Sequence, residues 1–165
     1  MKEKTLKTIN PATGKELDTY EYFTDQEAKD AVEECHQAFL KWREKSPKQR
    51  AEVIKAIGEK LTEYKAELVK LMTAEMGKLL KQGEQEIDLC AGICEWTAAN
   101  GPENLKDEER ELPDGGRGII TYSPIGVIYG IQPWNFPAYQ VIRYTIANLM
   151  AGNGVLSSML LTFLS

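Results

Sequence analysis

Residues 125–137 read IGVIYGIQPWNFP, an apolar run that ends in a turn flanked by two prolines. A continuous apolar run of this kind is typical of a strand buried on both faces of a parallel sheet. Residues 136–150 return to helical spacing, so the sequence predicts a buried strand followed by a crossover helix. The turn between them would lie at the carboxyl end of the strand, where open α/β sheets bind their ligands. We therefore expect an α/β fold with a site at this turn.

The composition excludes several classes of partner. The 165 residues include 20 Lys and Arg against 25 Asp and Glu, with both signs mixed along the chain, which argues against nucleic acid. Three cysteines without a secretory signal indicate a reducing compartment. The apolar stretch at residues 155–165 is interrupted by serines and is shorter than the ~20 residues that a membrane-spanning helix needs. We expect a cytoplasmic protein that binds neither nucleic acid nor membrane.

The segment before the buried strand is predicted to be mainly helical. Thr24 and Glu27 have the spacing of a capping box, and Gly77 is a typical helix stop. The predicted elements are a hairpin within residues 5–23, helices at residues 24–42, 46–75 and 79–99, a charged link, and an exposed strand at residues 117–123.

Asn135 is the candidate catalytic residue of the turn. Its side-chain amide is a neutral donor, suited to an oxyanion forming on a carbonyl carbon under attack, and one such donor is worth about 3 kcal/mol. The alternative is an asparagine that bonds its own backbone in the turn.

Other reactive residue types give no independent site. Cys90 and Cys94 are four residues apart on one helix face with Ile87, which is typical of a core stripe rather than a reactive pair. His36 is the only histidine, and we interpret it as a surface or hydrogen-bonded residue. No metal site is expected, because a metal would need more ligands than these.

Several motifs, in the same order, resemble the aldehyde dehydrogenase superfamily over residues 8 to 156. The matching segments are residues 10–14 (NPATG), 38–42 (AFLKW), 50–51 (RA), 75–78 (EMGK), 124–127 (PIGV), 133–137 (PWNFP) and 149–153 (LMAGN). The resemblance implies the amino-terminal part of that fold, with helices, an incomplete Rossmann-like parallel sheet and an oligomerisation strand.

The same resemblance assigns roles around the turn. It makes Asn135 the oxyanion donor and places four residues along the nicotinamide of NAD or NADP: Ile131, Gln132, Pro133 and Trp134. Arg143 stands where the succinate-semialdehyde branch has an arginine for the far carboxylate of the substrate. A guanidinium can hold a carboxylate in a bidentate manner. The alternative is a surface arginine on a helix.

The resemblance also sets the expected extent of the protein. We expect residues 1–156 to be a partial NAD(P)-binding domain, with oligomerisation strands near residues 110–123 and a homo-oligomeric parent that oxidises an aldehyde. The family's catalytic cysteine and glutamate lie further downstream, so we expect the catalytic domain to be absent and the chain alone to be inactive and not to bind the cofactor. One alternative is a non-catalytic protein that docks on intact aldehyde dehydrogenase subunits. A free-standing cofactor-binding module is another.

The last residues depart from the family pattern. Ser158 stands where the family has a lysine that bonds the adenosine ribose, and a hydroxyl lacks the reach and charge of an ammonium. A shift of the reading frame by one nucleotide allows Lys-His-Ala at this place, so we interpret residues 157–165 as an aberrant, frameshifted tail. The alternative is an authentic short protein whose apolar tail packs on another surface.

Overall fold

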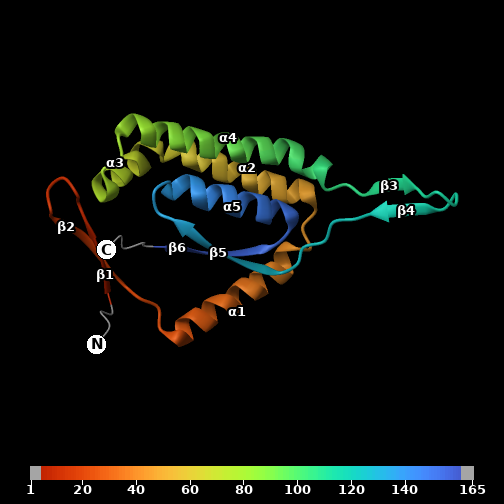
Figure 1. The fold of residues 1–165 in the computed structure, drawn as a ribbon, viewed down its shortest axis with the longest axis horizontal. Helices are drawn as coiled ribbons and strands as arrows, with labels where there is room; N and C mark the ends of the chain where they lie inside the picture. The colour runs from red at the N-terminus through yellow and green to blue at the C-terminus, as the bar shows by residue number, and fades with distance from the viewer. Residues whose placement is uncertain (1–4, 161–165) are drawn as a thin grey trace.

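The computed structural model describes residues 5–160. In chain order its elements are β1 (Thr5–Ile9), β2 (Glu16–Glu21), α1 (Asp25–Trp42), α2 (Pro47–Glu63), α3 (Lys65–Met76), α4 (Leu80–Asn104), β3 (Glu108–Glu111), β4 (Arg117–Ile120), β5 (Val127–Pro133), α5 (Pro137–Ala151) and β6 (Gly154–Leu160) (Figure 1).

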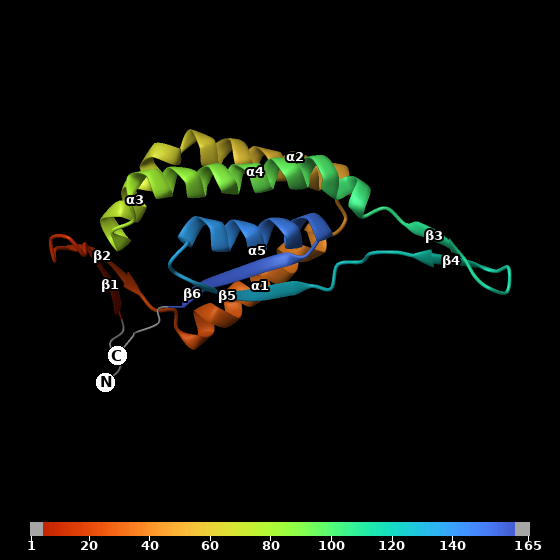
Figure 2. The ribbon, with the colours of Figure 1, turned by 45° about the horizontal axis from the view of Figure 1, so that its top comes forward.

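The elements are stacked in layers. Helices α2 and α4 pack side by side and cover α5, which lies on one face of the two-stranded sheet β5–β6 (Figure 2). Helix α1 packs on the opposite face of that sheet. The two strands are parallel, in a register that runs from Val127 opposite Gly154 to Pro133 opposite Leu160. The predicted strand and crossover helix are therefore confirmed as a β5–α5–β6 unit. The expected burial of the strand on both faces was wrong, because Tyr129 and Ile131 of β5 are 60% and 58% exposed.

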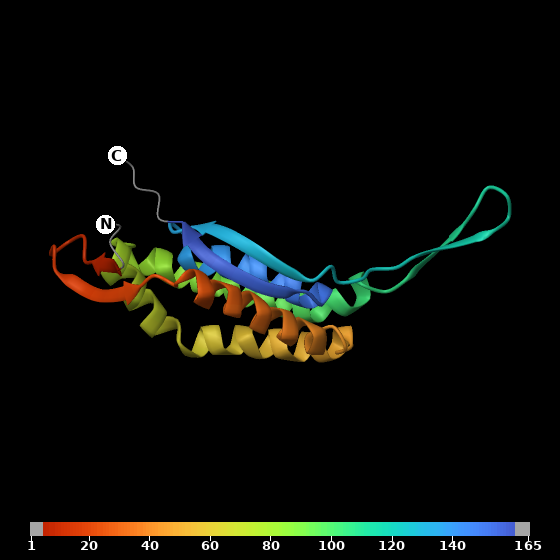
Figure 3. The same ribbon diagram turned by 90° about the horizontal axis from the view of Figure 1, so that it is seen from below.

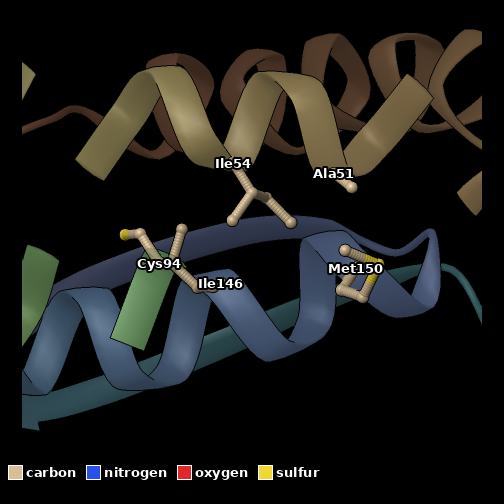
Figure 4. Packing of buried hydrophobic residues seen from close by; sticks show 5 residues of the cluster. All are labelled: Ala51, Ile54, Cys94, Ile146 and Met150. Atoms are coloured by element: carbon tan, nitrogen blue, oxygen red, sulfur yellow. The ribbon is translucent and has the colours of Figure 1, made fainter. Parts of the chain in front are cut away.

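The main core lies where α2, α4 and α5 meet. Five buried side chains fill it: Ala51, Ile54, Cys94, Ile146 and Met150 (Figure 4). A second cluster joins α3 to α4 through Val69, Met72 and Ile87. Cys90 and Cys94 have no exposed surface, which confirms the prediction that they belong to a core stripe.

The capping residues that start two helices and the glycine that stops a third are found in the structure. Thr24 and Glu27 form a full capping box at the start of α1, and Ser46 forms a second with Gln49 at the start of α2. Gly77 ends α3 at a φ of 70°, a conformation that favours glycine.

Two helix boundaries were predicted wrongly. The helix expected at residues 46–75 is broken at Tyr64, which lies at φ −90° and ψ 8°, and the break lets Val69 and Met72 turn onto Ile87. The helix expected to end at Ala99 runs to Asn104 with Pro102 inside it. Gly101 packs against Met150 of α5, so close that an added Cβ would lie 2.6 Å from it. Tertiary packing thus overrides the local stop signal.

The charged link was also predicted wrongly. Residues 108–111 form β3, which pairs with β4 in an antiparallel hairpin, and the strand expected at residues 117–123 ends at Ile120. This hairpin extends as an arm away from the helices (Figure 1, Figure 3). The hairpin predicted within residues 5–23 is confirmed as β1 and β2.

Within residues 5–160 no helix is long and apolar enough to cross a membrane.

Candidate functional site

The turn between β5 and α5 carries Asn135 at the surface. The strand ends at Pro133 and the helix begins at Pro137, and Asn135 is exposed between them. Within the described residues the Asn135 side chain has no hydrogen-bond partner, while its backbone carbonyl accepts a hydrogen bond from Lys78. Asn10 shows the contrasting case, because its Oδ1 accepts from the backbone of Ala12 at 2.9 Å. The Asn135 amide is therefore available to a ligand.

The start of α5 lacks a local cap. Phe136 at the N-cap position has no side-chain acceptor, and Pro137 has no N–H. The N–H groups of Ala138 and Tyr139 donate instead to Oε1 of Glu86, at 2.9 and 3.0 Å. Glu86 comes from α4, and its side chain is only 1% exposed. A carboxylate from a distant helix thus caps the helix that begins at the site.

Lys78 completes this arrangement from the opposite side. Its Nζ forms an ion pair with Oε2 of Glu86 and donates to the carbonyl of Asn135 at 3.2 Å. The ammonium also lies 4.0 Å from the centre of the Phe136 ring. The Lys78 side chain is 6% exposed, so its charge is balanced by Glu86 rather than by water.

Sequence analysis missed the role of this pair. Lys78 was quoted as part of a motif without a function, and Glu86 was not singled out. A signal was present, because Gly83, Glu86, Ile87 and Cys90 lie on one buried face of α4. A glutamate on such a face requires a partner.

The four predicted cofactor residues lie together along the end of β5 and into the turn. Ile131 is 58% and Trp134 40% exposed, whereas Gln132 is half-buried. The structure therefore presents two apolar side chains at the carboxyl end of the strand.

Arg143 lies further along α5, on its exposed side. Its guanidinium carbon is 5.9 Å from the centre of the Tyr139 ring. Tyr139 and Phe136 border a hollow of about 410 Å³ that is further lined by Lys78, Gln82, Gln85, Glu86 and Leu89. Phe136 and Tyr139 thus line this hollow, and Arg143 follows Tyr139 one helical turn further along α5.

A larger hollow of about 580 Å³ lies between β1, α3 and α5. Its walls are mainly apolar and include Trp134 and Pro137. The turn therefore borders two hollows, the smaller lined by Lys78 and Glu86 and the larger lined mainly by apolar side chains.

The carboxyl end of α5 is also held by hydrogen bonds to another part of the chain. Asn153 is 6% exposed, and its Oδ1 accepts from the N–H groups of Ile125 and Gly126 at 2.8 and 3.3 Å. This side chain ties the end of the helix to the beginning of β5.

The thiols are poorly suited to nucleophilic attack. Burial raises the pKa of Cys90 to about 12 and that of Cys94 to about 11, so both are protonated at neutral pH. Burial also raises the pKa of the half-buried Cys35. Across residues 5–160 no group of three His, Cys, Asp or Glu side chains is arranged to hold a metal ion.

Comparison with known proteins gives matches over nearly the whole chain. The family model described as "Aldehyde dehydrogenase family" matches residues 1–158. The chain is 35% identical over 154 residues to the NADP(+) succinate-semialdehyde dehydrogenase of Deinococcus radiodurans, covering 93% of this chain and 32% of that protein. It is 37% identical over 149 residues to the NAD(P)+ succinate semialdehyde dehydrogenase of Escherichia coli, covering 90% and 32%.

A solved structure shows the same fold. The succinic semialdehyde dehydrogenase of Streptococcus pyogenes, in complex with NADP+, matches with a TM-score of 0.88 and 32% identity, over 93% of this chain and 34% of that one. The chain spans about a third of the length of the curated relatives it matches.

The buried thiols generate a prediction about alkaline pH. Both have a higher pKa in the folded chain than the usual 9.0, so folding holds protons that the unfolded chain releases above pH 9. Their contribution to stability is complete below pH 9 and is lost as the pH rises towards 11 and 12. Between pH 9 and 10.5 each thiol should lower the free energy of unfolding by up to about 1.4 kcal/mol per pH unit.

Urea unfolding at a series of pH values, for the chain and for Cys90→Ala/Cys94→Ala, measures this slope. The double variant should have the shallower slope, and each single variant should remove part of the difference. Equal slopes in all four proteins would contradict the prediction.

Proposed function

This chain belongs to the aldehyde dehydrogenase family, and from that premise we propose that it forms part of an NAD(P)-dependent enzyme that oxidises an aldehyde to the carboxylic acid. Asn135 is proposed as the oxyanion donor. The observation that carries this proposal is the exposed, unbonded amide of Asn135 at the carboxyl end of β5. Succinate semialdehyde is the proposed substrate, because the relatives described above are named for it.

The proposed role of Asn135 follows from the chemistry of the reaction. When a thiolate adds to an aldehyde, negative charge develops on the former carbonyl oxygen, and a fixed N–H donor stabilises that charge. The thiolate is proposed to come from another part of the enzyme, since Cys90 and Cys94 are buried and protonated and burial also raises the pKa of Cys35. In this proposal the chain alone is inactive and supplies only one side of the active site.

Residues 131–134 are proposed to contact the cofactor because they include exposed apolar side chains. NAD or NADP would supply the acceptor for the hydride that leaves the aldehyde carbon. Ile131 and Trp134 are exposed apolar side chains at the carboxyl end of β5, a type of surface that suits a flat ring, and Gln132 and Pro133 lie between them in the chain. We assign residues 1–156 to part of the cofactor-binding domain and residues 157–165 to the aberrant tail, of which residues 157–160 pair with β5 in the structure.

Arg143 is proposed to hold the carboxylate of the substrate. Its guanidinium is exposed, stacks near Tyr139 and has no carboxylate partner within residues 5–160. A four-carbon semialdehyde could place its aldehyde at Asn135 and its carboxylate at this guanidinium.

The β3–β4 arm is proposed as a contact between subunits of a homo-oligomer. Ile119 is 65% and Tyr122 51% exposed, and the arm stands away from the helices (Figure 3). Apolar side chains on a projecting hairpin favour burial against another chain. The same observation supports the second candidate function, a protein that docks on intact aldehyde dehydrogenase subunits.

The first test concerns Asn135. Residues 5–156 would replace the matching third of the E. coli succinate semialdehyde dehydrogenase, and aldehyde oxidation by this chimera would be followed through reduction of the nucleotide. Asn135→Ala should lower kcat by about 10²- to 10³-fold, as loss of an oxyanion donor does elsewhere. Asn104→Ala, an exposed asparagine at the end of α4, is the matched control. If kcat of the Asn135→Ala variant stays within about twofold of the unchanged chimera, the proposed role of Asn135 is refuted.

The second test concerns Arg143 in the same chimera. Arg143→Met should raise KM for succinate semialdehyde by about 10- to 100-fold, the value of a charge-assisted hydrogen bond, and leave KM for the uncharged butanal unchanged. Arg43→Met, which removes another exposed guanidinium that lies over an aromatic ring, is the control. If the substitution raises KM for both aldehydes by the same factor, Arg143 does not recognise the carboxylate.

The third test concerns the arm. Ile119→Glu puts a charge on the proposed interface and should convert the oligomeric chimera to monomers, as measured by sedimentation. Val32→Glu, an exposed position of α1, should leave the assembly intact. Unchanged assembly of the Ile119 variant would refute the proposed contact. For the docking alternative, this chain would be added to the intact E. coli enzyme, and no change in its assembly or activity would rule that function out.

A further inference from the structure

The turn that presents Asn135 is held by groups outside itself. On its helical side, the N–H groups of Ala138 and Tyr139 have no acceptor within α5, because they belong to the first turn of a helix. Their acceptor is Glu86, at 2.9 and 3.0 Å. On its strand side, the carbonyl of Asn135 accepts from Lys78 at 3.2 Å. The two residues that hold the turn are bound to each other as an ion pair.

This pair is not needed merely to fill space. Apolar side chains of similar volume in place of a buried ion pair often leave stability unchanged or increase it. Here such side chains would, however, leave two partly buried N–H groups and the Asn135 carbonyl without these partners. The polar atoms of the pair are therefore directed at the backbone on both sides of Asn135.

The stacking of Phe136 adds a third contact. The Lys78 ammonium lies 4.0 Å from the ring centre of this residue, which directly follows Asn135. Three successive parts of the turn are thus fixed by two side chains: the Asn135 carbonyl, the Phe136 ring and the first N–H groups of α5. Little freedom remains for the backbone that carries the Asn135 side chain.

We propose that Lys78 and Glu86 are positioning residues, which fix the backbone of the turn so that the Asn135 amide keeps one direction towards the reacting carbonyl. This inference rests on the proposed function of Asn135. Neither residue touches the reacting atoms in this arrangement. Their effect reaches the reaction through the backbone of residues 135–139.

The test uses two double variants of the full chain that differ in a single acceptor. Lys78→Met/Glu86→Gln and Lys78→Met/Glu86→Leu both remove the buried charges, and their side chains are close in volume, but only the glutamine side chain keeps an oxygen for the two N–H groups. Hydrogen exchange of the Ala138 and Tyr139 amides is measured by NMR. It should be about tenfold or more faster in the Glu86→Leu variant than in the Glu86→Gln variant. The amides of Cys90 and Cys94 should exchange equally in both.

A matched control removes another ion pair from the same helix. Lys65 and Asp88 join α3 to α4 at 2.6 Å on the surface, and Lys65→Met/Asp88→Leu should leave the Ala138 and Tyr139 amides unchanged. Equal exchange in the two Glu86 variants would overturn the proposal. So would a loss of protection that spreads to Cys90 and Cys94, because the pair would then only stabilise the fold.

The catalytic consequence is measured in the chimera. Lys78→Met/Glu86→Leu should lower kcat about tenfold or more and leave KM unchanged, since the substrate still binds while the donor is misplaced. An unchanged kcat, when the amides have lost protection, would overturn the proposal. Asn135→Ala in the same chimera separates the two ideas: if it leaves kcat unchanged, the proposed function fails, whereas the exchange experiment still reports whether the pair holds the turn.

Discussion

The start of α5 imposes the constraint on which the site depends. Phe136, at the N-cap position of this helix, supplies no side-chain acceptor, so the partly buried N–H groups of Ala138 and Tyr139 have to find an acceptor elsewhere. Glu86 provides it, and this requires α4 to cross the beginning of α5. A buried carboxylate in turn requires a cation, which Lys78 supplies from the connection after α3. The unsatisfied start of α5 thereby determines how α4 and the end of α3 are placed relative to α5 and the turn.

The same constraint decides which donor can serve an oxyanion. A helix N-terminus at the carboxyl end of a strand is ordinarily an anion site, because its free N–H groups point outwards. Here Glu86 already occupies the N–H groups of Ala138 and Tyr139. The exposed amide of Asn135 is the neighbouring donor left without a partner in the described part of the chain. A side chain rather than the helix end is thus the group that can meet a developing negative charge.

The sequence allowed correct prediction where the signal is local. The capping box at Thr24, the stop at Gly77 and the strand–turn–helix around Asn135 each depend on residues within a few positions of one another. Predictions failed where distant packing decides. Tyr64 breaks a helix so that α3 can reach Ile87, and β3 forms from a run of charged residues because β4 pairs with it. The buried face of α4 indicates that Glu86 needs a partner, but no local pattern could reveal that this partner is backbone more than 50 residues away.

The groups proposed for catalysis and for substrate recognition are held in different ways. Asn135 lies on a turn fixed at both sides by a buried ion pair, and the helix behind it is fixed at its other end by Asn153. Arg143 is exposed and contacts only the face of Tyr139 among the described residues. A long side chain on a solvent-facing helix surface can be exchanged with little effect on the core. The donor proposed for the reaction is therefore carried by a turn that buried side chains hold, whereas the group proposed to select the aldehyde can vary without disturbing the core.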